Sequence, residues 1–169
     1  LRAYSPPLTI GPATVVDPAP TMPGVRSPAG LRRLEELEQA DGPRTLAAMV
    51  RERGLRGIPL GDTIARVGLA PGQVDAVVQG LERAGALRRA GDQLVSTKAI
   101  DDVAAKLVTL VKEFHAQQPL SEGLPREEAR ARLFAGVDGE VFETVMRGLT
   151  AARALVDRER LALHGYRMA

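Results

Sequence analysis

The side chains that most often carry chemistry are sparse in this sequence. Its two histidines, His115 and His164, lie far apart without a nearby set of ligands, and the chain contains no cysteine, so a disulfide framework or a thiolate zinc site is excluded. The phosphate-binding pattern G-x-x-x-x-G-K-[ST] and the G-x-S-x-G nucleophile elbow are both absent. His115 follows a long apolar helix pattern, so we interpret it as a helix C-terminal residue that interacts favourably with the dipole when protonated.

Two pairs of adjacent carboxylates are the other candidates for acid–base work. Asp101 and Asp102 form one pair, and Glu127 and Glu128 form the other. Each pair stands where a helix is expected to begin. Negative charge is favourable in the first turn of a helix, which explains these pairs better than a general acid/base role does. We therefore predict that this chain is not an enzyme and holds neither a cofactor nor a metal ion.

Nucleic-acid binding is the remaining chemistry to consider. The candidate residues are five arginines on the first hairpin and on a short helix of the second half: Arg88, Arg89, Arg126, Arg130 and Arg132. The alternative, which we favour for each cluster, is an ordinary solvated surface. The two helices that would read a DNA groove begin PGQVDAVVQ and DGEVFETVM, and their exposed acidic positions would repel phosphates. Sequence-specific DNA reading by these helices is therefore not expected.

The composition describes an aliphatic and nearly neutral chain. Of its 169 residues 44% are hydrophobic and only 3% are aromatic, so we expect aliphatic cores. The formal net charge of +2 is too small to argue by itself for binding driven by phosphate attraction. No apolar run approaches the roughly 18 residues of a membrane span, and the N-terminus lacks the order of a signal peptide. We expect a soluble, cytoplasmic monomer that does not bind membranes.

One pattern occurs twice and organises the chain. Residues 74–87 read VDAVVQGLERAGAL and residues 142–155 read FETVMRGLTAARAL, an offset of 68 residues. Each copy is a helix pattern that ends in a small-residue turn and is followed by a short apolar/polar alternation. This is the helix–turn–wing half of a winged-helix module. The predicted fold class is therefore mainly α with small β wings: tandem winged-helix modules, each of three helices and a β-hairpin.

The element boundaries of the first module, predicted over residues 29–97, follow from its glycines and prolines. An amphipathic helix is expected from residue 29, with leucines 31, 34 and 37 at three-residue spacing. Pro43 suits the first turn of the next helix and Gly54 its end. A third helix is expected over residues 60–67 with Ile64 and Val67 facing inward, and Pro71 opens a fourth. A hairpin then turns at residues 91–92.

The second module, predicted over residues 98–169, repeats this order. Thr97 is expected to cap a long helix whose apolar residues run from Ile100 to Phe114. Pro125 opens a short helix, and Asp138 caps the helix that carries Phe142. A second hairpin closes the module.

Residues 1–28 differ from both modules. They hold seven of the twelve prolines, and LTIGPATVVD within them has the alternation of a short strand or hairpin. Two short strands are not stable alone in water. The segment therefore reads as the end of a larger β domain followed by a linker, or as a strap lying on the helices.

Two stretches carry more specific motifs. The N-terminal one is LRAYSPPLTIG…VVDPAP, and the other is FHAQQPLSEGLPREEARARL at residues 114–133, with His115, Pro119, Gly123 and Glu128 at characteristic spacing. The first resembles the end of the third β-barrel domain of the bacterial SelB family, the selenocysteine-specific translation elongation factors. A Gly-Pro-Ala turn at residues 11–13 stands where that family carries a glycine triplet. The second stretch is similar to the segment that opens the family's second winged-helix module.

The resemblance implies an arm of a translation factor. In that family a GTPase body delivers selenocysteinyl-tRNA, and a C-terminal arm of four winged helices holds an mRNA hairpin near a UGA codon. Residues 1–28 would be the end of the β-barrel and a linker, and the two modules would be the first pair, a spacer and hinge. GTP and magnesium would bind outside this chain. Its partners would be the remainder of the same factor, the ribosome and the mRNA hairpin.

Two other functions stay open on the residues alone. One is a tandem winged-helix transcriptional regulator that dimerises through the helix at residues 100–114, against which the acidic reading helices count. The other is a protein–protein adaptor. A spacer predicts weak, salt-sensitive binding to RNA hairpins with little sequence preference. Tight, sequence-selective binding to duplex DNA would contradict it.

Overall fold

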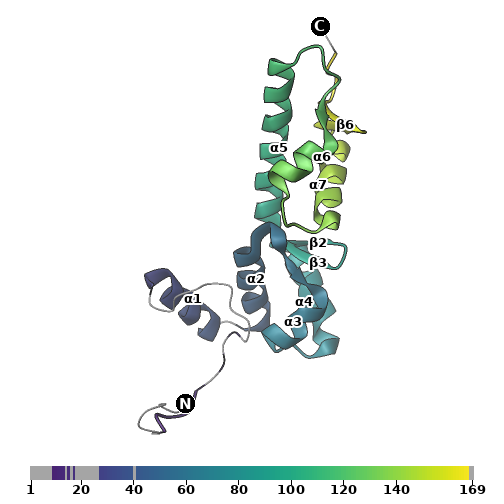
Figure 1. The fold of residues 1–169 in the computed structure, drawn as a ribbon. Coiled ribbons are helices and arrows are strands. Elements are labelled where there is room, and N and C mark those ends of the chain that lie inside the picture. The colour runs from purple at the N-terminus through teal and green to yellow at the C-terminus, as the bar shows by residue number, and fades with distance from the viewer. Residues whose placement is uncertain (1–8, 14, 16, 18–26, 40, 168–169) are drawn as a thin grey trace.

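Two winged-helix modules are stacked end to end in the computed structural model, which describes residues 9–13, 15, 17, 27–39 and 41–167. Figure 1 shows the first module below the second, with α1 beside the first. The described residues form helices and two small antiparallel sheets, which confirms the predicted fold class. The predicted end of a β-barrel falls largely outside the described residues and stays a prediction.

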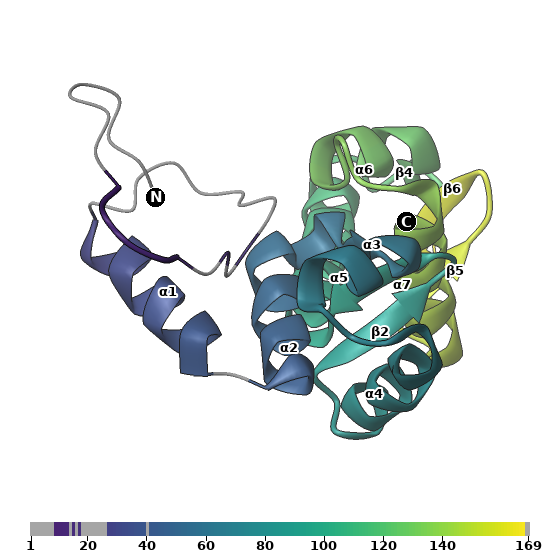
Figure 2. The same cartoon turned by 90° about the horizontal axis from the view of Figure 1, so that it is seen from below.

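The first module begins with a helix that lies outside the rest. Figure 2 shows α1 on one side of α2 and the other elements on the opposite side. The elements are α1 (Pro28–Gln39), α2 (Gly42–Arg53), the short 3-10 helix η1 (Gly54–Arg56), β1 (Ile58–Pro59), α3 (Leu60–Val67), α4 (Pro71–Arg83), β2 (Leu87–Ala90) and β3 (Gln93–Ser96).

The second module repeats the order without a counterpart of α1. A long helix runs along its whole length in Figure 1. The elements are α5 (Thr97–Gln117), β4 (Leu124–Pro125), α6 (Arg126–Leu133), α7 (Gly139–Ala151), β5 (Leu155–Asp157) and β6 (Arg160–Leu163).

Most helix ends lie where the punctuating residues predict. Asp41 caps α2 by accepting a hydrogen bond from the Arg44 amide at 3.0 Å, and Gly54 ends that helix with a positive φ of 56°. Asp138 caps α7 through the Glu140 amide at 2.8 Å. The expected cap of α5 was wrong by one residue. Ser96, not Thr97, is the N-cap, because its hydroxyl accepts from the Ala99 amide.

Each wing has a third strand that the sequence did not reveal. Wing 1 is the sheet β1-β3-β2 and wing 2 is the sheet β4-β6-β5. The added strands, β1 and β4, are two residues long and follow Gly57 and Gly123. A Cβ at Gly57 would lie 2.9 Å from the Leu94 carbonyl oxygen, and one at Gly123 would collide with the Leu161 carbonyl oxygen. Both glycines also have positive φ, of 65° and 152°, so they allow the short strands to pair.

The buried faces of α1 and α3 differ from the prediction. Leu37 is 5% exposed against α2, but Leu31 is 50% exposed, because α1 has a helix along one side only. On α3, Val67 packs against the core, but Ile64 is 42% exposed. The buried residue of α3 is Thr63, which satisfies its hydroxyl by donating to the Leu60 carbonyl at 2.6 Å.

A cluster of ion pairs connects Asp17, which precedes α1 in the sequence, to the first module. The Asp17 carboxylate, whose side chain is 2% exposed, lies 2.5 Å from Arg33 of α1 and 3.3 Å from Arg66 of α3. Arg33 also donates to Glu52 of α2 at 2.7 Å. Burial lowers the pKa of Arg33, but its hydrogen bonds to the two carboxylates outweigh this, and the pKa is raised overall. The cluster therefore connects three helices through a permanent charge.

Candidate nucleic-acid interface and the joint between the modules

The two arginines predicted on wing 1 both face carboxylates. Arg88 Nη2 lies 3.3 Å from Asp101 of α5. The first turn of α5 holds no acidic residue, because the helix begins at Thr97, so the predicted first-turn position of Asp101 and Asp102 was wrong. Arg89 Nη2 lies 3.1 Å from Asp75 of α4, and its backbone amide donates to Glu82 at 3.3 Å. Side chains of both residues stay partly exposed, at 50% and 35%. Their charges are therefore shared with acidic neighbours rather than presented alone to a phosphate.

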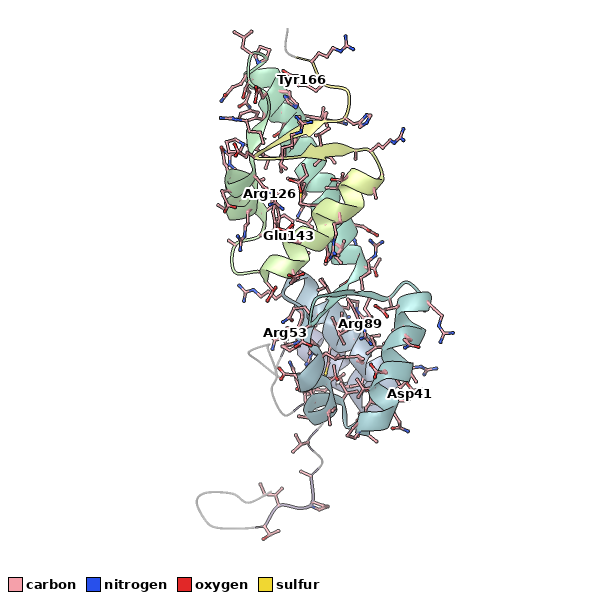
Figure 3. All side chains as sticks on the ribbon, turned by 90° about the vertical axis from the view of Figure 1, so that its right-hand side faces the viewer. Asp41, Arg53, Arg89, Arg126, Glu143 and Tyr166 are labelled. Carbon is pink, nitrogen blue, oxygen red and sulfur yellow. The ribbon has the colours of Figure 1, made fainter. Side chains whose placement is uncertain are left out.

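Arg126 is the most enclosed of the three predicted arginines in the second module. It lies 2.7 Å from Glu143 of α7 and 3.1 Å from Asp157 of β5, and its guanidinium sits 5.0 Å from the centre of the Phe142 ring (Figure 3). Burial raises the pKa of Asp157, Arg126 lowers it and Glu143 raises it, with a net upward direction. Arg126 therefore connects α6, α7 and wing 2, which is a structural task.

The other two predicted arginines pair along their own helix. Arg132 lies 2.5 Å from Glu128, and Arg130 lies 3.9 Å from Glu127. Glu127 and Glu128 occupy the first turn of α6, as their position next to Pro125 predicts. The structure thus brings none of the five arginines together into a shared, unopposed basic patch. A role for them in nucleic-acid binding stays a prediction.

The reading helix of the second module starts against wing 1. A Cβ at Gly91, in the wing 1 turn, would lie 2.8 Å from Cγ of Glu140, the second residue of α7. In a groove-reading winged helix the N-terminal residues of this helix contact base edges. Here the turn of wing 1 lies against Glu140, while Asp138 and Glu140 stay exposed. The leading turn of α7 therefore presents two carboxylates, which would repel the phosphates of a DNA groove.

Wing 1 also forms part of the core of the second module. The outer face of a wing is the face that points away from the helices of its own module. On the outer face of wing 1, Ala90 and Val95 are each 0% exposed and belong to one hydrophobic cluster with α5 and α7 residues such as Leu107 and Val141. Leu55 of η1 packs against the same cluster. We call this contact the joint between the modules.

His115 has a structural position at the end of α5. It is 6% exposed, its ring stacks on Tyr166 at 3.5 Å between centroids, and its Nε2 accepts a hydrogen bond from the Leu163 amide at 3.3 Å. The Tyr166 hydroxyl donates to the Pro119 carbonyl at 2.8 Å. Burial lowers the pKa of His115, so the ring is neutral. His115 lies in the last turn of α5, as predicted, but its position there does not depend on a charge interaction with the helix dipole.

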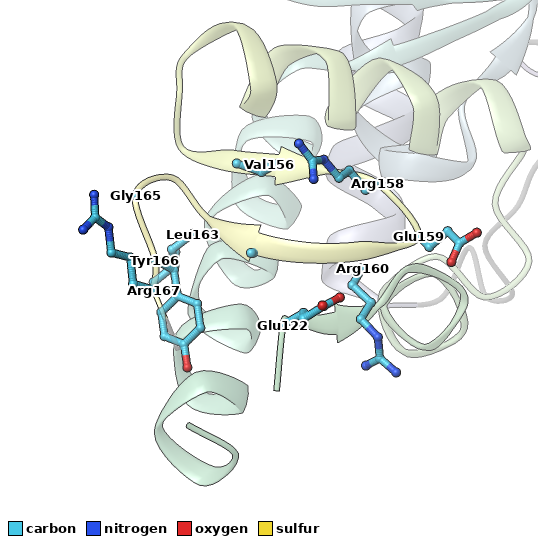
Figure 4. A pocket seen from close by; sticks show the side chains of 10 residues that line it. Glu122, Val156, Arg158, Glu159, Arg160, Leu163, Gly165, Tyr166 and Arg167 are labelled. Atoms are coloured by element: carbon cyan, nitrogen blue, oxygen red, sulfur yellow. The ribbon is translucent and has the colours of Figure 1, made fainter. Parts of the chain in front are cut away.

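A groove on the outer face of wing 2 is a feature that the sequence did not predict. It has a volume of about 710 Å³ and is drawn in Figure 4. Its lining residues are Glu122, Val156, Arg158, Glu159, Arg160, Ala162, Leu163, Gly165, Tyr166 and Arg167. The strand register could have indicated it, because the alternation in residues 155–163 places Arg158 and Arg160 on the face opposite Leu155 and Leu161.

The second module matches a known protein family. The matching family model is described as "Elongation factor SelB, winged helix", and the match covers residues 108–163. Residues 108–163 are a SelB winged-helix domain. This confirms the family resemblance drawn from residues 114–133 and places the module in an elongation-factor family. No curated protein gives a significant match to the chain.

No helix of the part of the chain that the structure describes is long and apolar enough to cross a membrane. Among the same residues, no group of three or more His, Cys, Asp or Glu side chains is placed to hold a metal ion. A winged helix is itself a binding or structural domain rather than a catalytic one.

Proposed function

We propose that this chain is the spacer arm of a selenocysteine-specific translation elongation factor. The arm would hold a fixed distance and direction between a GTPase and tRNA-binding body and the modules that hold an mRNA hairpin at a UGA codon. GTP and magnesium would bind to that body, and the ribosome and the mRNA would be partners of the complete factor. The SelB domain at residues 108–163 supports this family context.

The observation that carries the spacer role is the joint. A hinge between two modules needs an interface that can part, and such interfaces are usually polar and small. Here Ala90 and Val95 of wing 1 are fully buried in the core of the second module. Separating the modules would expose that apolar surface to water at roughly 25 cal/mol per Å². We therefore propose that the pair moves as one body and that bending of the arm occurs outside the joint.

The positions of the reading helices support the same role. The start of α7 lies against wing 1 and carries the exposed carboxylates of Asp138 and Glu140, and the outward face of α4 carries Asp75 and Glu82. Neither helix then offers a row of unopposed basic side chains to a DNA groove. A tandem transcriptional regulator would need basic or amide side chains on the exposed face of at least one of them, so this alternative receives no support.

The experiment opens the joint inside the complete factor. Ala90→Arg places a long cation in the buried contact, and Ala76→Arg places the same side chain on the exposed face of α4 as a control. The readout is selenocysteine insertion at a UGA codon in a reporter, with GTP hydrolysis and tRNA binding measured alongside. We expect insertion to fall at least tenfold for Ala90→Arg, with both other activities kept and the control near normal. Normal insertion by a factor whose joint is demonstrably open would contradict the spacer role.

A further inference from the structure

The internal repeat allows the outer faces of the two wings to be compared position by position. In wing 1, Ala90 pairs with Gln93 and Arg88 pairs with Val95, and these four residues form the outer face. In wing 2, Val156 pairs with Ala162, and Arg158 and Arg160 flank the hairpin turn. By the repeat offset of 68 residues, Arg158 corresponds to Ala90. By the strand register, Arg160 corresponds to Gln93 and Ala162 corresponds to Val95.

The same face therefore has a different chemistry in each wing. Ala90 is 0% exposed because the second module covers it. Arg158 at the corresponding position is exposed, and Val156 and Ala162 beside it are only half-buried. Packing another module here as the second packs on wing 1 would bury the Arg158 guanidinium in an apolar contact, which costs several kcal/mol for an unpaired charge. The outer face of wing 2 is not a second copy of the joint.

The charges of the groove are largely unopposed. Arg158, Arg160 and Arg167 have no carboxylate within ion-pair distance among the residues that the structure describes, whereas all five arginines predicted from the sequence have one. Arg160 is held in place because its Nη1 donates to the Gly123 carbonyl at 3.0 Å, which leaves its other N–H groups for a ligand. Figure 4 shows Arg158, Arg160 and Arg167 on three sides of the hairpin, with their guanidinium groups pointing outward.

The carboxylates near the groove only partly offset this charge. Glu122 and Glu159 both line it, and neither forms an ion pair with an arginine in the described part of the chain. Three guanidinium groups against two carboxylates leave a net positive groove. The Arg160 guanidinium is held by the Gly123 carbonyl and keeps further N–H donors, and guanidinium donors match the geometry of phosphate oxygens.

We propose that the outer face of wing 2, at Arg158, Arg160 and Arg167, binds the phosphate backbone of RNA. The identity of the polyanion rests on the proposed function, because an arm working between the ribosome and an mRNA lies among RNA phosphates. Such contacts position a protein on the nucleic acid without reading its bases. Binding through the wing also leaves both reading helices and the joint undisturbed.

The test measures binding of this chain to a fluorescently labelled RNA hairpin by fluorescence anisotropy. The measurement is repeated at salt concentrations from about 50 to about 200 mM, because binding to phosphates weakens steeply over this range. The variant is Arg158→Gln with Arg167→Gln. The matched control is Arg44→Gln with Arg83→Gln, two exposed arginines of module 1 for which no carboxylate lies within ion-pair distance among the described residues. We expect about tenfold or greater loss of affinity for the wing 2 pair and a fall of about 2 in the slope of log K against log salt. The control pair should stay within about twofold.

Three outcomes would overturn the proposal. Equal losses in both pairs, or no loss in either, would show that wing 2 is not the phosphate site. Competition by polyglutamate as effective as that by unlabelled RNA would show that the groove takes an acidic protein segment instead. The rigidity of the joint is measured separately, so a failure here leaves the spacer function standing, and a flexible joint would leave this site standing.

Discussion

Wing 1 and wing 2 share a repeat and a strand order, but one is covered and the other is open. The inner faces agree: Leu87 and Leu94 in wing 1 and Leu155 and Leu161 in wing 2 are all within 1% of full burial. The outer faces diverge, with Ala90 buried in the joint and Arg158 exposed in the groove. The residues that repeat between the two modules form the core of each module. The outer residues of the wings do not repeat, and they determine what each wing contacts.

The largest effect should come from charging the covered wing. Val95→Asp places a carboxylate in a fully buried apolar contact without a partner, so we expect about 3–5 kcal/mol loss in the free energy of unfolding. Ala162→Asp makes the same change at the matching position of wing 2 and should cost below about 1 kcal/mol, because that face is half open. Urea unfolding of both variants measures the difference. Equal losses would show that the two faces are equally buried.

A smaller loss of stability is expected at the two glycines that directly precede the third strands, β1 and β4. Gly123→Ala combines a positive φ with a collision at the Leu161 carbonyl, and Gly57→Ala combines a positive φ with a close contact at the Leu94 carbonyl. We expect losses of about 3 and about 2 kcal/mol. Their controls are Gly80→Ala in α4 and Gly148→Ala in α7, where a Cβ meets open space.

Each control replaces a glycine inside a helix, so each should stabilise its module by about 0.5–1 kcal/mol. Thermal unfolding monitored by circular dichroism measures all four variants. Destabilisation by either helix control would contradict the packing described for α4 or α7. A neutral Gly123→Ala would mean that β4 does not pair with β6 as described.

The smallest expected effect is a pH dependence of the free energy of unfolding that comes from the second module. Both histidines lie in the second module, and the folded-state pKa of His115 is below its usual value of about 6.5 because the ring is buried. The unfolded chain then binds more protons than the folded chain between these two pKa values. Stability is therefore complete above about pH 6.5 and falls as the pH drops through that window.

Substitution of each histidine assigns this pH dependence. His115→Gln should remove the decline attributed to His115, and His164→Gln should leave it in place. Urea unfolding at several pH values between 5 and 7.5, about the range in which histidine titrates, measures both. A decline that persists in His115→Gln and vanishes in His164→Gln would assign the pH dependence to His164 and contradict this prediction.

The helices could be predicted from the sequence because their ends are marked locally. Pro43, Gly54, Pro71 and Asp138 act through their own backbone or the next few amides, so their effect is visible without knowledge of the fold. The same reasoning failed by one residue at Ser96, where two adjacent hydroxyl residues compete for the cap. It failed for Ile64, because α3 is short and its contacts with the rest of the module select the Thr63 side.

The joint and the groove could not be predicted in the same way. Ala90 borders the wing 1 turn and reads as a solvent-exposed tip, and only the tertiary arrangement shows that the second module covers it. The Arg132–Glu128 pair follows from helical spacing, but Arg126 and Glu143 are 17 residues apart and meet only in the fold. The arginines of the groove were missed because the sequence does not show which arginines have a carboxylate nearby in the folded chain.

The central claim, that the two modules move as one body, can be tested by a single distance distribution. The chain contains no cysteine, so spin labels attach only at introduced ones, at Gln79→Cys on α4 and Lys112→Cys on α5, both exposed. Pulsed electron–electron resonance should give one narrow distance peak, and adding Ala90→Arg should broaden it. A broad or multiple distribution in the otherwise unaltered chain would contradict a rigid joint.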